Sequence, residues 1–234
     1  MARRPATPDE ELLGAQEAAV ASEISDATRV ARMTAELELG FRELDGLHRA
    51  ASVFGSARTS PGTPEYELAR TVGRRLGAAG FAVITGGGPG AMEAANCGAR
   101  DAGARSIGLN IDLPFEHDHA GRYVDLSLDF HYFFCRKVMF VRYANAFVAL
   151  PGGFGTLDEL FEALTLVQTK KVTKFPVVLL GTDYWGGLYE WIQRTVLSHG
   201  KIGDKDVRLL YLTDEVDDAV KVVHEAYRAW EEAH

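Results

Sequence analysis

Residues 81–92 read Phe-Ala-Val-Ile-Thr-Gly-Gly-Gly-Pro-Gly-Ala-Met, and residues 146–156 read Ala-Phe-Val-Ala-Leu-Pro-Gly-Gly-Phe-Gly-Thr. In both stretches a short apolar run gives way to a glycine-rich turn that opens a helical pattern. An apolar run of this length, bounded by turn residues, is typical of a strand that is buried on both faces. Each stretch therefore predicts a strand of a parallel sheet that is followed directly by a helix.

The same alternation extends in both directions along the chain. We expect strands at residues 50–54, 81–85, 106–111, 123–128, 146–150, 176–180 and 208–212. We expect helices at residues 64–79, 89–102, 131–143, 156–168, 184–198 and 215–230. This order predicts an α/β fold, a Rossmann-like, doubly wound, mostly parallel sheet of about seven strands flanked by helices. Ligands of such sheets bind at the carboxyl ends of the strands.

The N-terminal part of the chain has a different character. We expect residues 1–10 to be a disordered tail. Residues 10–47 are rich in Ala and Glu, and their apolar side chains recur at steps close to three and four. This spacing predicts an amphipathic helical extension, which we expect to be broken once near Ser25 and Asp26. The chain is therefore divided into residues 1–47, tail and extension, and a single Rossmann-like domain at residues 48–234.

Charge and composition limit the function classes. The chain has 25 Lys and Arg against 33 Asp and Glu, a net charge of −8, which argues against a general nucleic-acid binder. No stretch approaches the roughly 20 apolar residues of a membrane span, and no signal segment stands at the start. We therefore expect a cytoplasmic protein with no membrane partner. Cys97 and Cys135 fit neither a redox pair nor a zinc site, so we expect reduced structural thiols.

Both glycine-rich turns are candidate anion sites, because backbone N–H groups and a helix dipole converge there. Residues 55–58, Gly-Ser-Ala-Arg, form a third, weaker candidate after the first strand. Tight turns from strand to helix also need glycine for purely structural reasons. Residues 86–91 fit the dinucleotide pattern Gly-x-Gly-x-x-Ala, but they follow the second strand, and Asn110 stands near the place of the expected acidic residue. A classical NAD site is therefore disfavoured.

Two charged side chains near these turns are candidates for chemistry. Glu159 lies one turn into the helix that follows the second glycine turn. Thr156 and Glu159 also fit a capping box, in which they would only close the helix start. Arg136 stands in a helix so apolar that we expect it to be buried on most sides. Its guanidinium should therefore either reach the surface or meet an anion, such as a phosphate or Glu159.

Residues 151–159, Pro-Gly-Gly-Phe-Gly-Thr-Leu-Asp-Glu, resemble the P-G-G-x-G-T-x-x-E signature of the LOG ("lonely guy") cytokinin riboside 5′-monophosphate phosphoribohydrolases, long labelled lysine decarboxylases. Residues 86–92 are similar to that family's first glycine loop, and residues 136–137 match its Arg-Lys pair. The resemblance implies that Arg136 and Glu159 are the catalytic pair. It implies a substrate-binding set of Gly87, Gly88, Met92, Glu116, Lys137, Gly152, Gly153, Gly155, Thr156, Asp158 and Thr165.

The implied reaction is hydrolysis of the N-glycosidic bond of an adenine-type nucleoside 5′-monophosphate, without a cofactor or metal. Glu159 would stabilise the positive charge that develops on the ribose and orient the attacking water. A non-catalytic carrier of a nucleotide or of a phosphorylated cofactor, such as molybdenum cofactor, is the alternative, and it would not need Arg136 and Glu159. Decarboxylation with pyridoxal phosphate is disfavoured, because no lysine stands in a suitable context. The natural base stays open.

We also expect a homo-oligomer, a dimer or larger. The helices predicted at residues 131–143 and 156–168 carry more apolar side chains than one layer over a sheet needs. These side chains include Phe133, Phe140, Phe161, Leu164 and Val167. The family resemblance implies the same assembly.

Overall fold

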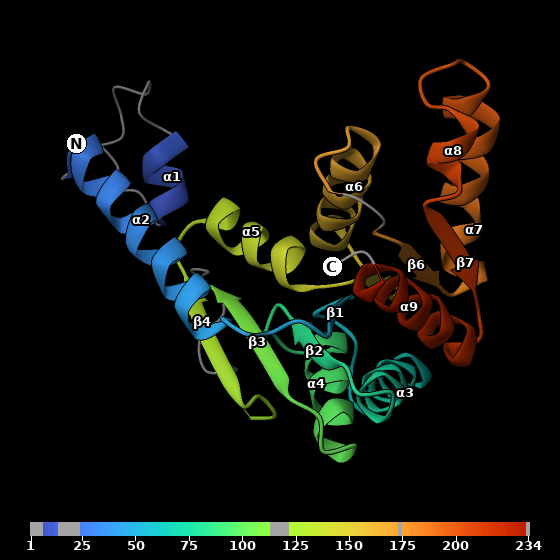
Figure 1. The fold of residues 1–234 in the computed structure, drawn as a ribbon, viewed down its shortest axis with the longest axis horizontal. Helices are drawn as coiled ribbons and strands as arrows, with labels where there is room; N and C mark the ends of the chain where they lie inside the picture. The colour runs from blue at the N-terminus through green and yellow to red at the C-terminus, as the bar shows by residue number, and fades with distance from the viewer. Residues whose placement is uncertain (1–6, 14–23, 113–121, 173–174, 233–234) are drawn as a thin grey trace.

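The structure, a computed structural model, describes residues 7–13, 24–112, 122–172 and 175–232. Within them one sheet has seven strands in the order β4-β3-β2-β1-β5-β6-β7 (Figure 1), and every neighbouring pair is parallel. The strands are β1 (Ala50–Phe54), β2 (Ala82–Thr85), β3 (Ser106–Ile111), β4 (Leu126–Phe130), β5 (Phe147–Ala149), β6 (Val177–Leu180) and β7 (Leu210–Thr213). The predicted fold class is confirmed.

Helices cover both faces of the sheet. On one face lie α5 (Phe133–Tyr143), α6 (Phe154–Gln168) and α7 (Thr182–Trp191), and on the other lie α3 (Pro64–Ala78), α4 (Ala91–Asp101) and α9 (Val216–Glu231). In β1, Ala50 and Phe54 pack into the first core, whereas Ala51 and Val53 pack into the second. All five residues of β1 are buried, which explains why all of them except Ser52 are apolar.

Several element boundaries differ from the sequence prediction. β4 was expected at residues 123–128 and instead runs from Leu126 to Phe130, because this edge strand alternates and its inward side chains are Leu126, Leu128 and Phe130. The helix expected from Thr156 begins two residues earlier, as α6, with Gly153 at its N-cap. The helix expected at residues 184–198 is α7 continued by the π-helical η1 (Ile192–Leu197), and α8 (Asp204–Val207) follows.

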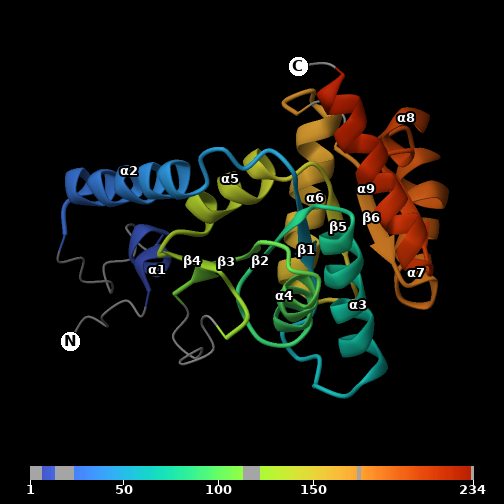
Figure 2. The ribbon, with the colours of Figure 1, turned by 60° about the horizontal axis from the view of Figure 1, so that its bottom comes forward.

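The N-terminal segment contributes α1 (Pro8–Leu13) and α2 (Asp26–Glu43). Residues 8–10, expected to be part of a disordered tail, are helical, while residues 14–23 lie outside the described residues. α2 begins at Asp26, the position of the expected break, and the hydroxyl oxygen of its N-cap Ser25 accepts a hydrogen bond from the N–H of Thr28 at 3.2 Å. Figure 2 shows α1 and α2 at the opposite end of the molecule from α7, α8 and α9.

Among the described helices, none combines the length and the apolar character that crossing a membrane requires.

Candidate active site

A pocket of about 840 Å³ lies at the carboxyl ends of β1, β2 and β5. Its wall combines residues 54–59 after β1, Gly86, Gly88 and Met92 after β2, and residues 151–157 after β5. β1 and β5 are neighbours in the sheet, but the helices that follow them, α3 and α6, cover opposite faces. A doubly wound sheet binds its ligand at such a switch point. The pocket therefore lies where the fold class predicts a site.

Backbone hydrogen bonds join the three loops at this end of the sheet. The N–H of Ser56 donates to the carbonyl of Pro151 at 3.0 Å, and the N–H of Ala91 donates to the carbonyl of Ser56 at 3.0 Å. The loop after β1, the weakest candidate in the sequence, thus bridges the two glycine-rich loops. The three loops thus form one hydrogen-bonded rim around the pocket.

The glycine-rich loop after β5 brings the start of α6 to the pocket. Gly153 is the N-cap without a side-chain capping bond, and the first turn of α6 contains no acidic residue. N–H groups in a first helical turn lack intrahelical partners and favour an anion. A Cβ on Gly152 would lie 2.1 Å from the hydroxyl oxygen of Thr156, so only glycine lets these two residues approach so closely. Such an arrangement favours a negatively charged group at the start of α6.

Glu159 lies in the wall of the pocket and is only 4% exposed. Among the described residues, no side chain or backbone group donates a hydrogen bond to its buried Oε2 atom. Burial raises the pKa of Glu159 to about 7, and the positive charges of Lys137 and Arg136 oppose this rise. The capping-box interpretation is wrong, because α6 begins before Thr156 and leaves Glu159 beyond its first turn. The carboxyl is therefore available for a role in the pocket.

Arg136 reaches the same pocket from α5 and is half-buried. A Cβ on Gly86 would lie 3.8 Å from its Nη1 atom, and its guanidinium lies 5.0 Å from the ring centre of Phe133 and 5.6 Å from that of Phe140. The guanidinium thus lies next to the glycine-rich loop after β2. The expectation that α5 is buried on most sides is wrong for the single chain, because Phe133, Phe134 and Val138 are about 40% exposed.

Eight of the expected site residues line the pocket, namely Gly88, Met92, Arg136, Gly152, Gly153, Gly155, Thr156 and Glu159. Lys137 lies outside it, where its Nζ atom makes ion pairs with Asp158 and Glu162, both at 2.8 Å. Thr165 lies with Lys137 and Asp158 along a neighbouring surface hollow between α5 and α6. Gly87 lies just behind the pocket wall, where its N–H donates to the Thr85 hydroxyl at 3.0 Å. Glu116 lies outside the described residues.

The pocket is also lined by Arg58, from the weaker candidate loop after β1, and by Tyr184, which the sequence did not single out. The hydroxyl of Tyr184 donates to the carbonyl of Gly152 at 2.6 Å and so supports the loop after β5. Tyr184 follows β6, whose carboxyl end lies beside that of β5. The order of strands in the sheet, which a single sequence does not fix, was the missing information.

Known proteins are similar to this chain in sequence and in fold. A family model described as "Possible lysine decarboxylase" matches residues 92–223, more than half of the chain. A cytokinin riboside 5′-monophosphate phosphoribohydrolase of Mycobacterium marinum is 32% identical over 164 residues, which cover 69% of this chain and 87% of the relative. The chain belongs to this family, the LOG family.

Other proteins similar to this LOG-family chain carry different names. A pyrimidine/purine nucleotide 5′-monophosphate nucleosidase of Escherichia coli is 30% identical over 174 residues, which cover 69% of this chain and 37% of that longer protein. Among solved structures, a Moco carrier protein of Chlamydomonas matches with a TM-score of 0.57 and 26% identity, over 77% of this chain and 98% of that one. The similar proteins thus include some named as enzymes and one named as a carrier.

Proposed function

We propose that the chain is a phosphoribohydrolase that cleaves the N-glycosidic bond of adenine-type nucleoside 5′-monophosphates, giving the free base and ribose 5-phosphate. The observation that carries this proposal is Glu159, a buried carboxyl in the wall of a pocket that is otherwise suited to an anion. Relatives named as phosphoribohydrolases and as a nucleotide nucleosidase support an enzyme of this kind.

Cleavage of a ribosyl–base bond builds positive charge on the sugar as the base leaves. A carboxylate beside the anomeric carbon stabilises that charge and accepts a proton from the attacking water. Glu159 suits this role because its pKa of about 7 keeps a large share of carboxylate at neutral pH and still makes it a competent base. The ribose is expected to lie over Glu159.

The 5′-phosphate is assigned to the start of α6, where Gly153, Gly155 and Thr156 present the first-turn N–H groups. Arg136, next to the glycine-rich loop after β2, would hold the substrate from the opposite side. The phosphate lies away from the bond that breaks, so its binding energy serves to orient the sugar. Lys137, Asp158 and Thr165, on the face next to the pocket, are proposed to act at its edge in the assembled oligomer.

The second candidate is a carrier that binds a nucleotide or a phosphorylated cofactor without turnover, and the likeness to a Moco carrier protein favours it. A carrier would use the hydrogen-bonded rim but has no need of an unpartnered carboxyl in the pocket. Oε2 of Glu159 has no hydrogen-bond donor among the described residues, which costs stability and so favours a catalytic role.

The test is to incubate the purified chain with AMP, isopentenyladenosine monophosphate, CMP and adenosine, and to quantify free base. We expect base from both adenine monophosphates and at least about a hundredfold less from adenosine, because the phosphate supplies the orienting energy. Equal cleavage of AMP and adenosine would remove the phosphate role of the loop after β5. Tight binding of AMP without release of base would favour the carrier. CMP tests whether the pocket accepts bases as broadly as the name of the E. coli relative implies.

A further inference from the structure

The start of α5, the helix that carries Arg136, is held by carboxylates from the N-terminal segment. Tyr132 is the N-cap of α5, but its own side chain makes no capping hydrogen bond. Instead, Oε2 of Glu36 accepts from the N–H of His131 at 3.2 Å and from the N–H of Tyr132 at 3.3 Å. Oδ2 of Asp9 accepts from the N–H of Phe133 at 3.2 Å. Carboxylates at a helix N-terminus satisfy its N–H groups and interact favourably with its dipole.

The rest of α2 follows α5 closely. A Cβ on Gly40 would lie 2.6 Å from the side chain of Met139, so the backbone of α2 lies directly against that side chain. At the far end, the hydroxyl of Tyr143 donates to the carbonyl of Phe41 at 3.3 Å, and the guanidinium of Arg142 lies 4.8 Å from the ring centre of Phe41. Both ends of α5 are therefore fixed to the extension.

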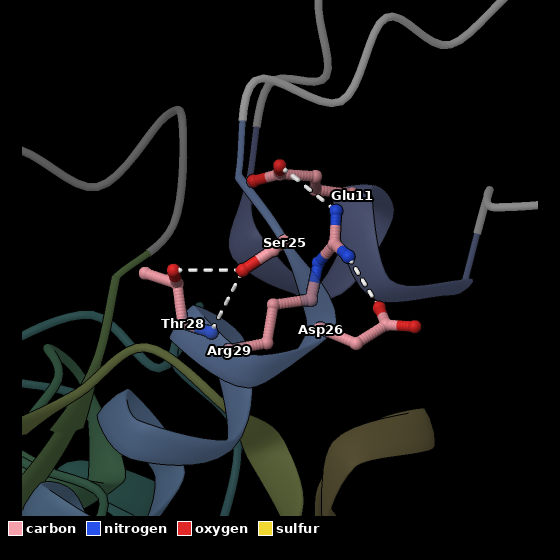
Figure 3. Close-up of polar contacts among 5 residues, drawn as sticks. All are labelled: Glu11, Ser25, Asp26, Thr28 and Arg29. Atoms are coloured by element: carbon pink, nitrogen blue, oxygen red, sulfur yellow. Dashed lines mark hydrogen bonds and ion pairs between the residues drawn. The ribbon is translucent and has the colours of Figure 1, made fainter.

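The short helix α1 is in turn fixed to α2 by a buried arginine. Figure 3 shows the guanidinium of Arg29 between Glu11 of α1 and Asp26 of α2. Its Nη2 atom lies 3.1 Å from Oε1 of Glu11, and its Nη1 atom lies 2.6 Å from Oδ1 of Asp26. Arg29 is only 5% exposed, and a buried charge of this kind keeps its partners in place. Asp9 precedes Glu11 by two residues on α1, so the same contact helps to fix its carboxylate beside α5.

The anchored end of α5 is one turn from the active-site arginine. The N–H of Arg136 donates to the carbonyl of Tyr132 at 3.4 Å. The first turn of α5 therefore positions the backbone of Arg136, from which its side chain extends. The charge of Arg136 also reaches Asp9: burial raises the pKa of Asp9, and the Phe133 N–H and the Arg136 guanidinium oppose this rise. The same guanidinium also opposes the rise in the pKa of Glu159. Arg136 thus interacts electrostatically with a carboxyl of the extension and with the carboxyl of the pocket.

We propose that Asp9 and Glu36 are positioning residues for Arg136, which by capping α5 hold its guanidinium in the pocket in the place that catalysis requires. The N-terminal extension then contributes to the active site by positioning Arg136. The effect on catalysis rests on the proposed function. The anchoring of α5 by Asp9 and Glu36 does not depend on it.

Hydrogen exchange followed by mass spectrometry tests the anchoring without any activity. Asp9→Ala and Glu36→Ala should each speed exchange in a peptide covering residues 131–136 by roughly fivefold or more, because each removes an acceptor for those amides. Asp9→Asn keeps an acceptor oxygen and should exchange like the wild type. Glu38→Ala, at an exposed site on the same helix α2, is the matched control. Unchanged exchange at residues 131–136 in both alanine variants would overturn the proposal.

A double-mutant cycle tests whether the effect passes through Arg136. Asp9→Ala should lower kcat/KM for AMP by about tenfold in the wild-type chain but by less than about twofold in the Arg136→Ala background. Asp9→Asn should restore most of the loss. Equal losses in the two backgrounds would mean a merely structural role and would refute the positioning. If the wild-type chain releases no base from any monophosphate, the proposed function fails, and the exchange experiment still decides the anchoring.

Discussion

Glu159 is both ionisable and buried, a combination that a protein keeps only at a cost. Burial disfavours its charged form, and the charges of Lys137 and Arg136 recover only part of that loss, so that the pKa stays near 7. Because α6 begins at Phe154, the carboxyl has no capping role that would explain its place. A raised pKa of this kind is typical of a general base that acts near neutral pH.

This burial makes stability depend on pH, with a sign that can be worked out. The folded pKa of about 7 lies above the unfolded value of 4.5, so the folded state binds the proton more tightly. The free energy of unfolding should therefore fall as the pH rises from about 4.5 to 7, by about 3 kcal/mol from this group. Urea unfolding of the wild type and of Glu159→Gln at pH 5 and pH 8 measures the effect. A pH dependence that is the same in both proteins would contradict the raised pKa.

At the scale of elements, the rim of the pocket depends on close approach at one glycine. Gly152→Ala would place a Cβ 2.1 Å from the Thr156 hydroxyl oxygen and 2.7 Å from Thr156 Cβ, so the start of α6 must move. We expect the KM for AMP to rise about tenfold or more, on the scale of overpacking costs. A Cβ on Gly153 would meet nothing within 4 Å, so Gly153→Ala should raise the KM for AMP much less. Steady-state kinetics of the two variants provide the comparison, and equal losses would contradict this account of the loop.

Local patterns predicted most elements, and long-range contacts explain the rest. β1 and β3 have the predicted limits because each is buried along most of its length and is mainly apolar in sequence. β4 was misplaced because an edge strand alternates, and α6 because Gly153, with no side chain to signal it, is the N-cap. The contacts of Asp9 and Glu36 with the start of α5 join residues about a hundred positions apart. No local pattern contains that information.

At the scale of the whole molecule, α5 and α6 leave an apolar surface uncovered. Its exposed side chains are Phe133, Phe134, Val138, Phe154 and Phe161. Phe140, which the sequence placed among the surplus apolar side chains, is instead 1% exposed and belongs to the core. Surfaces of this kind are typical of subunit interfaces, and in a symmetric dimer the same patch would serve both chains.

The expected assembly is therefore a dimer or larger that forms through this apolar surface. Light scattering at micromolar concentration should give at least twice the chain mass of 25.6 kDa. Phe161→Glu should lower the mass toward that of one chain, because a charge would have to be buried at the contact. Glu38→Ala, at an exposed polar site on α2, should leave the mass unchanged. A monomeric wild-type chain with full activity would contradict the expectation.

The release of adenine and ribose 5-phosphate from AMP, by the wild type and by folded Glu159→Gln, tests the central claim most directly. Circular dichroism shows that the variant is folded, and chromatography quantifies the base. The account predicts turnover by the wild type and a loss of at least about a hundredfold in Glu159→Gln, the scale of losing a positioned catalytic group. Arg136→Ala should lower the turnover of AMP by a similar factor. Near-normal release of adenine by folded Glu159→Gln would contradict the mechanism.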